Sequence, residues 1–419
     1  MVDLFRRNPD YRRLFLAAVV SLLGDWFALV AVTGLVSDLT GSAALIASVF
    51  AASVLPVFLA SPLAGVVADR VDRRTLMVGV DLARILPALA LLLALHLQLA
   101  WLAIACVVLL ATLSAFFEPV VSAVMPNLLE PQDLELGQAL MGGVWGTMLF
   151  VGAGLGGIVA AVFGREAAFL VNAASFALSA LLIVGIRRPF RTGPVSAPAT
   201  VLAHLGEVWR FVKPRHLTKA LMSTKTGVGV ANGIVGLLPA FASIRFGGGD
   251  EAVGLLLAAR GLGALVGPFI ARRFIRGDGR RLVLVCGAAI LSYGVAYAFL
   301  PLTTSLLLAA LCVALAHAGG GAQWVLSTYG LQATTPDAVR GRVMSLDFGL
   351  ATLAIGVSSL GAGAAAEIVG LRATSWALVV VALVYGVTWL LWTRPLWRAD
   401  APDPLAPEAI PAHSSSRRR

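Results

Sequence analysis

Long uninterrupted runs of apolar residues constrain this chain more than any other feature. Each run reaches or exceeds about 20 residues, the length that an α-helix needs to cross the hydrocarbon core of a bilayer. The runs lie near 14–37, 43–67, 75–96, 99–123, 137–163 and 166–187, and again near 217–244, 251–273, 281–300, 303–329, 340–366 and 372–394. They predict an all-α integral membrane protein with twelve transmembrane helices in two groups of six.

The composition agrees with this fold class and excludes others. Only 13% of the residues are charged and 59% are hydrophobic, whereas soluble domains carry roughly 25% charged residues. The first run is longer than the core of a secretory signal peptide, which spans roughly 7–15 residues. Cys106, Cys286 and Cys312 all lie inside apolar runs. We therefore expect no disulfide framework, no metal site and no cofactor.

The basic residues indicate how the helices are oriented. The formal net charge is +10, and most Lys and Arg residues lie before the first run, after the second, between the sixth and seventh, after the eighth and tenth, and at the chain end. The loops on the other side contain only Arg165, Arg245 and Arg372. Basic loops stay in the cytoplasm. The sequence thus predicts a multi-pass protein of the cell (inner) membrane with both termini cytoplasmic, and the charge is a topology signal rather than a sign of nucleic acid binding.

Four parts of the chain are expected. They are an N-terminal six-helix bundle at 1–187, a cytoplasmic linker at 188–216, a C-terminal six-helix bundle at 217–394 and a disordered cytoplasmic tail at 395–419. The linker ends in the amphipathic stretch LAHLGEVWRFVKP, which predicts an interfacial helix with Trp209 and Phe211 toward lipid. A plain solvated linker is the alternative. The tail is rich in Pro, Ala and Ser.

The two groups of spans resemble each other. EPQDLELGQALM before the fifth span is similar to TPDAVRGRVMSL before the eleventh, which aligns Pro131 with Pro336 and Gly137 with Gly341. A parallel repeat of six spans is typical of secondary transporters built from two bundles. We therefore expect the two bundles to be related by a pseudo-two-fold axis.

A charged loop between the second and third spans carries a family signature. Its sequence reads Gly65-x-x-Ala68-Asp69-Arg70-x-x-Arg73-Arg74. This resembles the loop G-x-L-A-D-R-x-G-R-R/K of the major facilitator superfamily, from which Val67 and Asp72 depart. A solvated charge run is the alternative interpretation. The resemblance implies the twelve-helix fold of that superfamily and a conformational latch toward the start of span eleven, formed by Gly65, Asp69, Arg70, Arg73 and Arg74. Ala271 replaces the acid in the second repeat, so we expect a one-sided latch.

A glycine motif in the fifth span bears on the direction of transport. Gly152-Ala153-x-x-Gly156-Gly157 resembles the antiporter signature G-P-x-x-G-G, with Ala153 in place of proline. Close helix packing by small residues is the alternative. The stretches SLLGDWFALVAVTGLVSDLTGS and FLVNAASFALSALLI resemble the enterobactin-type and macrolide-type exporters of the same superfamily. These resemblances imply export.

Ionisable residues inside the spans are candidates for proton coupling, because a charge in the membrane interior marks a pathway or an ion pair. Asp25, His317 and Asp347 are our candidates. Asp25 has a structural carboxylate as its alternative role, and His317 a role in packing. Asp347 is also a candidate partner for an arginine of the signature loop. Asp81 and Arg84 are three residues apart on one helix, and we expect them to pair with each other.

Further residues are candidates for lining a substrate cavity. Lys225 and Arg260 are expected to be counter-charges for an acid or contacts for an anionic cargo, although Lys225 is also placed to snorkel toward headgroups. Large aromatic side chains suit an amphipathic cargo. The full candidate set is Trp26, Phe27, Trp145, Lys225, Arg260, Gln323 and Trp324.

The predicted function is secondary active export of amphipathic small molecules across the inner membrane by alternating access with proton antiport. Its partners are the cargo, protons and membrane lipids, and the protein is expected to act as a monomer. A dedicated siderophore exporter or a lysophospholipid transporter of the same fold is the alternative. No H-E-x-x-H, G-x-S-x-G or P-loop motif occurs in the sequence, so an enzyme is not expected.

Overall fold

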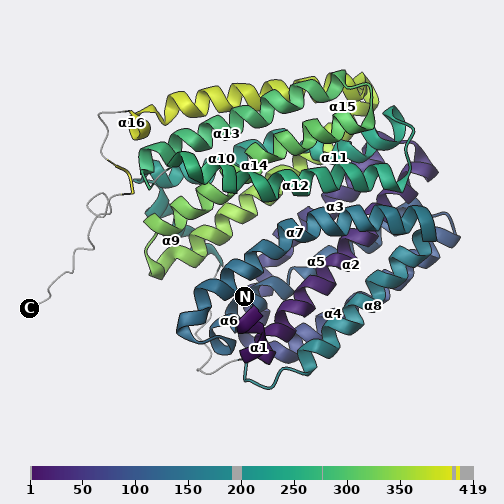
Figure 1. The fold of residues 1–419 in the computed structure, drawn as a ribbon, viewed down its shortest axis with the longest axis horizontal. Coiled ribbons are helices and arrows are strands. Elements are labelled where there is room, and N and C mark those ends of the chain that lie inside the picture. The colour runs from purple at the N-terminus through teal and green to yellow at the C-terminus, as the bar shows by residue number, and fades with distance from the viewer. Residues whose placement is uncertain (1, 191–200, 276, 399–402, 406–419) are drawn as a thin grey trace, which may run out of the picture.

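The computed structural model describes residues 2–190, 201–275, 277–398 and 403–405, and all regular elements in these ranges are helices (Figure 1). Eleven helical segments among the described residues are long and apolar enough to cross a membrane. The last of them contains α15 (Asp337–Trp392), in which two helices meet at the non-helical Gly370. The predicted twelve spans are therefore confirmed.

The first half of the chain forms one bundle, and the second half forms the other. The N-terminal bundle contains α1 (Val2–Arg7), α2 (Pro9–Thr40), α3 (Ala43–Arg70), α4 (Arg73–His96), α5 (Ala100–Ser114), α6 (Phe117–Leu128), α7 (Pro131–Phe163) and α8 (Arg165–Val184). After α9 (Val201–Val212), the C-terminal bundle contains α10 (His216–Ala231), α11 (Gly233–Ala240), η1 (Phe241–Arg245), α12 (Asp250–Ile275), α13 (Gly279–Phe299), η2 (Leu300–Leu302), α14 (Leu306–Thr334), α15 and α16 (Arg394–Trp397).

Local sequence signals explain why several helices extend past the apolar runs. The first spanning helix begins at Pro9 rather than near residue 14, because Asn8 caps it by accepting a hydrogen bond from the Tyr11 N–H at 2.9 Å. The same helix ends at Gly41, whose φ of 59° suits a residue without a Cβ. Ser42 then caps α3 through the Leu45 N–H at 3.2 Å. Two capping residues thus set a tight connection between the first two spans.

The internal repeat is visible in the backbone. Gly164, between the fifth and sixth spans, has φ 85° and ψ 160°. Gly370, between the eleventh and twelfth spans, has φ 84° and ψ 161°. Side chains with a Cβ rarely adopt this conformation. Corresponding positions of the two bundles therefore make the same turn with the same residue type.

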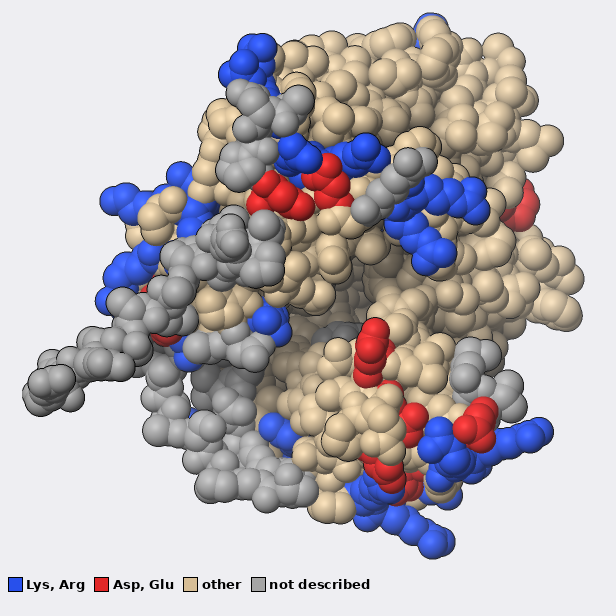
Figure 2. All heavy atoms as spheres, turned by 60° about the vertical axis from the view of Figure 1, so that its left-hand side comes forward, with Lys and Arg blue, Asp and Glu red and all other residues tan. Residues whose placement is uncertain are grey.

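The bundles pack together at one end and separate at the other. We call the end that holds α1, α9 and α16 the terminal face (Figure 1). The other end, where Gly41, Gly164 and Gly370 connect successive spans, is the opposite face. The bundles meet where α3 packs on α15 and where α7 packs on α12. Figure 2 shows a hollow between the two bundles on the terminal side, with Lys and Arg side chains near its rim.

Glycines along α7 show the same difference. Toward the opposite face, a Cβ at Gly157 would lie 2.7 Å from the backbone oxygen of Asp250 and 2.9 Å from the Cα of Gly254. Toward the terminal face, no atom lies within 4 Å of a Cβ built at Gly142 or Gly146. The half of α7 near the opposite face therefore packs closely against α12, and we call its glycines the clamped glycines. The other half faces open space.

The linker and the tail contact the C-terminal bundle. Glu207 of α9 forms an ion pair with Arg342 at the start of α15. The expected tail begins at 395, yet the Trp397 indole donates to the Leu390 carbonyl at 3.1 Å. Asp403 accepts a hydrogen bond from the Gly279 N–H at 3.0 Å. These contacts extend the folded chain past residue 394, because Trp397 packs back on α15; the rest of the expected tail, and 191–200 of the linker, lie outside the described residues.

Candidate functional site

Two carboxylates surround one guanidinium inside the N-terminal bundle. Arg84 Nη2 lies 2.5 Å from Asp25 Oδ2, and Arg84 Nη1 lies 3.6 Å from Asp81 Oδ1. The expected pairing of Asp81 with Arg84 is thus present, but Asp25 from another helix is the closer partner. The Arg84 and Asp81 side chains are buried, whereas 29% of the Asp25 side chain is exposed. We call Asp25, Arg84 and Asp81 the acidic triad.

Neighbouring side chains hold the acidic triad in place. The Arg84 guanidinium lies 4.0 Å over the Phe176 ring and donates to Ser21 Oγ at 3.0 Å. The Ser179 hydroxyl donates to Asp81 Oδ2 at 2.6 Å. These contacts supply some of the partners that buried charged groups require. They do not neutralise the charge of the triad, because it contains two carboxylates and only one guanidinium.

The C-terminal bundle contains a matched ion pair. Lys225 of α10 pairs with Asp347 of α15, and both side chains are buried. The Lys225 ammonium also lies 5.5 Å from the centroid of the Trp324 ring. Lys225 therefore acts as the counter-charge of an acid, and its side chain does not extend toward the lipid headgroups. The expectation that Asp347 receives an arginine of the signature loop is wrong, because this interior lysine occupies it.

Arg260 of α12 is buried without an anionic partner. It is 7% exposed, and it forms no hydrogen bond or ion pair with any residue that the structure describes. Its guanidinium instead lies 5.3 Å from the Phe50 ring and 5.7 Å from the Trp145 ring, both in the N-terminal bundle. Such cation–π contacts contribute about 0.5–2 kcal/mol, whereas removing a charge from water costs several kcal/mol. The charge of Arg260 is therefore incompletely compensated.

His317 lies in an aromatic cluster. The Tyr297 hydroxyl is 2.9 Å from His317 Nε2. The Tyr293 ring packs edge-on against the imidazole, and its hydroxyl donates to Asn232 at the break between α10 and α11. His317 and both tyrosines are buried. Aromatic side chains thus enclose His317, as its alternative role in packing predicts, and its role in proton coupling stays a prediction.

The aromatic cavity candidates fall into two groups. Trp26 and Phe27 are buried, and Trp26 packs edge-on against Trp145 with ring centroids 6.5 Å apart. Trp145 is 49% exposed although it contacts Arg260 of the other bundle. It therefore lies where the bundle interface opens into the hollow. Trp26, Trp145 and Arg260 thus come together at the interface.

The remaining candidates, Gln323 and Trp324, lie on α14 in the C-terminal bundle. Gln323 is buried, and its Oε1 has no hydrogen bond within the described chain. Trp324 packs edge-on against Phe348 with ring centroids 6.2 Å apart. It belongs to the surroundings of Lys225 rather than to those of Arg260.

The glycine motif of α7 allows close helix contacts. A Cβ at Gly152 would lie 3.0 Å from the Trp26 Cβ, and one at Gly156 would lie 2.9 Å from the Phe27 Cα. Gly157 faces α12 in the other bundle, as described above. Close packing is thus realised at all three glycines, and their role as an antiporter signature stays a prediction.

The signature loop is anchored in its own bundle. Arg73 donates to the carbonyls of Ala123 at 2.9 Å and Phe190 at 3.0 Å, and Arg74 donates to that of Arg188 at 3.0 Å. The described contacts of these arginines do not reach span eleven as expected, because the bundles separate at this face. The surroundings of Gly65 and of the Asp69 side chain lie outside what the structure describes, and Arg70 is exposed.

Asp72, which departs from the family signature, has a local role. Its carboxylate caps α4 by accepting hydrogen bonds from the Thr75 N–H and hydroxyl, both at 2.9 Å. The backbone hydrogen bond from Thr75 is the main cause that lowers the pKa of Asp72 below its usual value. Part of the charge in this loop therefore serves to start the third span.

Sequence reasoning missed an ion-pair network on the opposite face. Arg165 of α8 donates to Asp250 of α12 through Nε at 2.8 Å and Nη2 at 3.2 Å, and its Nη2 lies 2.8 Å from Asp38 of α2. A Cβ at Gly34 would lie 1.6 Å from Asp250 Oδ1, so only glycine admits this carboxylate. The available signal was that Arg165 is one of three arginines on the side poor in basic residues. The network ties the two bundles together.

A second contact joins the bundles at the same end. Glu367 of α15 accepts hydrogen bonds from the Ser42 hydroxyl at 2.6 Å and the Ala44 N–H at 3.0 Å, at the start of α3. This carboxylate thus lies at a helix N-terminus, where negative charge is favourable. Both polar connections close the end at which the glycines of α7 are clamped.

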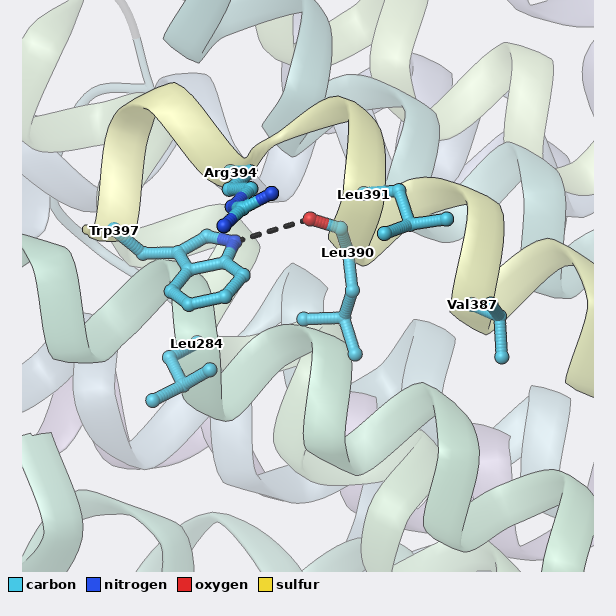
Figure 3. Close-up of a pocket in the computed structure, with 6 residues that line it drawn as sticks. All are labelled: Leu284, Val387, Leu390, Leu391, Arg394 and Trp397. Carbon is cyan, nitrogen blue, oxygen red and sulfur yellow. Dashed lines mark hydrogen bonds between the residues drawn. The ribbon is translucent and has the colours of Figure 1, made fainter.

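A shallow groove of about 390 Å³ lies elsewhere, between α13, α15 and α16 (Figure 3). Its lining is mainly apolar and consists of Leu284, Val387, Leu390, Leu391, Arg394 and Trp397. Trp and Arg at the end of a transmembrane helix are typical anchors at the membrane–water interface. We interpret Arg394 and Trp397 as anchors of this kind. None of the residues that line the groove belongs to the buried charged clusters of the two bundles.

Two six-helix bundles that enclose buried charges, close at one face and separate at the other define a transporter of the major facilitator superfamily. The chain belongs to the transmembrane secretion effector family of that superfamily, whose family model matches residues 5–414. It is thus a multi-pass membrane transporter of small molecules and not an enzyme.

Comparison with known proteins agrees. The multidrug efflux pump Tap of Mycolicibacterium fortuitum is 30% identical over 397 residues, which cover 91% of this chain and 95% of Tap. The uncharacterised major facilitator-type transporter YfiS of Bacillus subtilis strain 168 is 25% identical over 280 residues, 64% of this chain and 65% of YfiS.

Solved structures share the fold. A POT family transporter in complex with 5-aminolevulinic acid superposes with a TM-score of 0.76 at 12% identity, over 92% of this chain and 96% of that one. A bacterial homologue of the lysosomal transporter Spinster, in an inward-facing and unoccupied conformation, gives a TM-score of 0.71 at 15% identity, with the same coverage of both chains.

Proposed function

We propose that this protein exports amphipathic small molecules across the cell membrane by alternating access, in exchange for protons. The acidic triad carries the proposal. Two carboxylates share one guanidinium in an apolar bundle, so the triad has one surplus negative charge when both acids are ionised. Such a surplus is costly in a medium of low dielectric constant. Uptake of one proton removes it.

We assign the proton to Asp25. Its side chain is 29% exposed at the surface of the protein, whereas that of Asp81 is fully buried within it. The close contact with Arg84 Nη2 means that protonation of Asp25 weakens a bond between α2 and α4. Proton binding is thereby linked to the packing of two spans, which is the kind of differential interaction that biases a conformational equilibrium.

The interface between the bundles supports alternating access. The Arg165 network and the clamped glycines close the opposite face, and the hollow opens the terminal face. Because the terminal face carries most of the Lys and Arg residues, we assign it to the cytoplasm. A cargo then enters from the cytoplasm and leaves on the other side, as a relative that is a multidrug efflux pump leads us to expect.

Flux in proteoliposomes tests the proposal. Vesicles are loaded with ethidium, an amphipathic cation, or with anilinonaphthalene sulfonate, an amphipathic anion, and are then diluted into acidic buffer. We expect the inward proton gradient to accelerate the efflux of at least one probe. In Asp25→Asn, efflux falls to that of protein-free vesicles while probe binding is retained.

Asp3→Asn is the matched control. It makes the same chemical change at an acid of the terminal face whose side chain is 77% exposed, and it should leave gradient-driven efflux unchanged. Efflux of neither probe by the wild type would contradict the proposal. Full activity of Asp25→Asn would remove Asp25 from the coupling path.

A further inference from the structure

We infer that Arg260 binds an anionic group of the cargo, so that the preferred cargo has an aromatic or apolar body and one oxyanion, such as a carboxylate, phosphate or sulfonate. The inference rests on the proposed transport function and names the substrate class within it. It starts from the difference between Arg260 and the other buried basic residues of the chain.

Those other residues have carboxylate partners. Among the described residues, the buried Arg84 contacts Asp25 and Asp81, and the buried Lys225 contacts Asp347. Even the partly exposed Arg165 contacts two carboxylates. Arg260 is as deeply buried, yet its neighbours among the described residues are aromatic side chains, namely the two rings named above and the uncharged tyrosines of the His317 cluster, and none of them carries a negative charge. Its Nε–H is inaccessible to solvent and donates to no described acceptor. A guanidinium has five N–H donors and no acceptor, so a group that satisfies it must bring negative or lone-pair-bearing atoms.

The surroundings of Arg260 offer an apolar wall and, one side chain away, a further donor. The Trp26 indole N–H is buried and donates to no described acceptor, and its ring lies against Trp145. Trp145 itself contacts Arg260 and is half exposed. Donors without acceptors beside an exposed aromatic ring match a ligand with acceptor oxygens at one end and an apolar body at the other.

The position of this site ties ligand binding to transport. Arg260 belongs to the C-terminal bundle, whereas Phe50 and Trp145 belong to the N-terminal bundle. An anion at Arg260 therefore contacts groups whose separation changes when the bundles move. A ligand that binds the two arrangements with different affinity shifts the balance between them.

An anionic cargo also fits the proposed exchange with protons. A monovalent anion that leaves while one proton enters moves two elementary charges in the direction that a negative interior favours. An uncharged cargo moves one charge, and a monovalent cation moves none. The inference thus predicts that a negative interior accelerates efflux of the anion most, even without a pH gradient.

Binding of two matched probes tests the inference directly. Anilinonaphthalene sulfonate and phenylnaphthylamine share their ring system and differ in the sulfonate. Binding to the protein in phosphatidylcholine nanodiscs is followed by energy transfer from tryptophan, with empty nanodiscs as background. We expect Arg260→Gln to weaken sulfonate binding by about ten- to a hundred-fold, and to change phenylnaphthylamine binding by less than about two-fold. Arg260→Lys should retain part of the sulfonate affinity, because it keeps the charge but not the planar fork.

Arg272→Gln is the matched control, because Arg272 also lies on α12 and stacks on an aromatic ring, 5.5 Å from that of Phe269, but is exposed. It should leave both affinities unchanged. Unchanged sulfonate affinity in Arg260→Gln, or equal losses for both probes, would overturn the inference. A phosphatidylglycerol headgroup as the occupant would also overturn it, and would appear as a drop in sulfonate affinity in nanodiscs of that lipid that Arg260→Gln abolishes.

The flux assay separates this inference from the proposed function. If the wild type moves ethidium along the proton gradient but neither binds nor moves the sulfonate, only the assignment of Arg260 fails. If neither probe moves, transport driven by protons fails as well.

Discussion

The interiors of the two bundles carry opposite charge, although their helices follow the same plan. In the N-terminal bundle, Asp25 and Asp81 share Arg84, which leaves one surplus negative charge. In the C-terminal bundle, Lys225 and Asp347 cancel each other, and Arg260 adds one positive charge without a carboxylate partner among the described residues. The repeat therefore preserves the helices and the glycine turns but not the buried chemistry.

This difference suggests a division of work. A surplus carboxylate attracts a cation as small as a proton, whereas an unpaired guanidinium attracts an anion. Both surplus charges are costly where they lie. The simplest explanation for an unfavourable surplus charge in each bundle is that a ligand neutralises it during transport, a proton in one bundle and an anion in the other.

The largest expected effect comes from removing the buried arginine of each bundle, which increases the surplus charge of one bundle and removes that of the other. Arg84→Met deprives two carboxylates of their only described cation, so we expect it to lower the free energy of unfolding by about 3–5 kcal/mol. Arg260→Met removes a charge that has no carboxylate to leave behind, and stability should be unchanged or higher. Thermal unfolding of both variants in the same detergent compares them.

This pair of variants is its own control, since both replace a buried arginine by the same apolar side chain. Equal destabilisation by the two changes would mean that Arg260 is compensated as fully as Arg84. The comparison between the bundles would then fail.

The next effect concerns the matched pair in the C-terminal bundle. Lys225→Met leaves a buried carboxylate on Asp347 and should cost about 3 kcal/mol, because breaking a buried pair exposes one charge to a medium of low dielectric constant. Adding Asp347→Leu should recover most of that loss. Unfolding of the two single variants and the double variant measures the coupling free energy. Additive losses would show that the two residues do not act as a pair.

Much of this architecture can be predicted from the sequence. Runs of about 20 apolar residues fix the spans because the bilayer fixes their length, and the Lys and Arg residues distinguish the two faces. The aligned halves predict the repeated plan of the two bundles, although not the glycine turns at its end. These features can be recognised from the local composition of the sequence, or from a comparison of its first half with its second half.

The partners inside the bundles are not local. The spacing of Asp81 and Arg84 predicts their contact, but Asp25 reaches Arg84 from α2, and Lys225 reaches Asp347 from a distant helix. Spans in lipid are apolar on all sides, so periodicity does not reveal which face of a helix meets which neighbour. The Arg165 network escaped prediction because its members lie at the termini of three different helices, which are far apart in the sequence.

The smallest effect tests whether the two unequal bundles move as separate bodies. Arg165→Gln removes a guanidinium that joins Asp38 and Asp250 across the opposite face, and we expect it to weaken that closed end by about 2 kcal/mol. The loss is smaller than in the interior, because Arg165 and Asp38 are partly exposed. Spin labels at Leu97 and Leu302, which are exposed near that face on different bundles, should report a new population at longer distance.

Arg281→Gln is the matched control for this last variant. Arg281 lies 3.8 Å from Asp278, and both residues belong to the C-terminal bundle. Its ion pair therefore spans no interface, and the distance distribution should stay as in the wild type. If Arg165→Gln also leaves the distribution unchanged, the close glycine contacts of α7 and the Glu367 hydrogen bonds keep the opposite face closed without Arg165. A population shift in Arg165→Gln but not in Arg281→Gln would mean that one guanidinium, shared by an acid of each bundle, sets how readily that face opens.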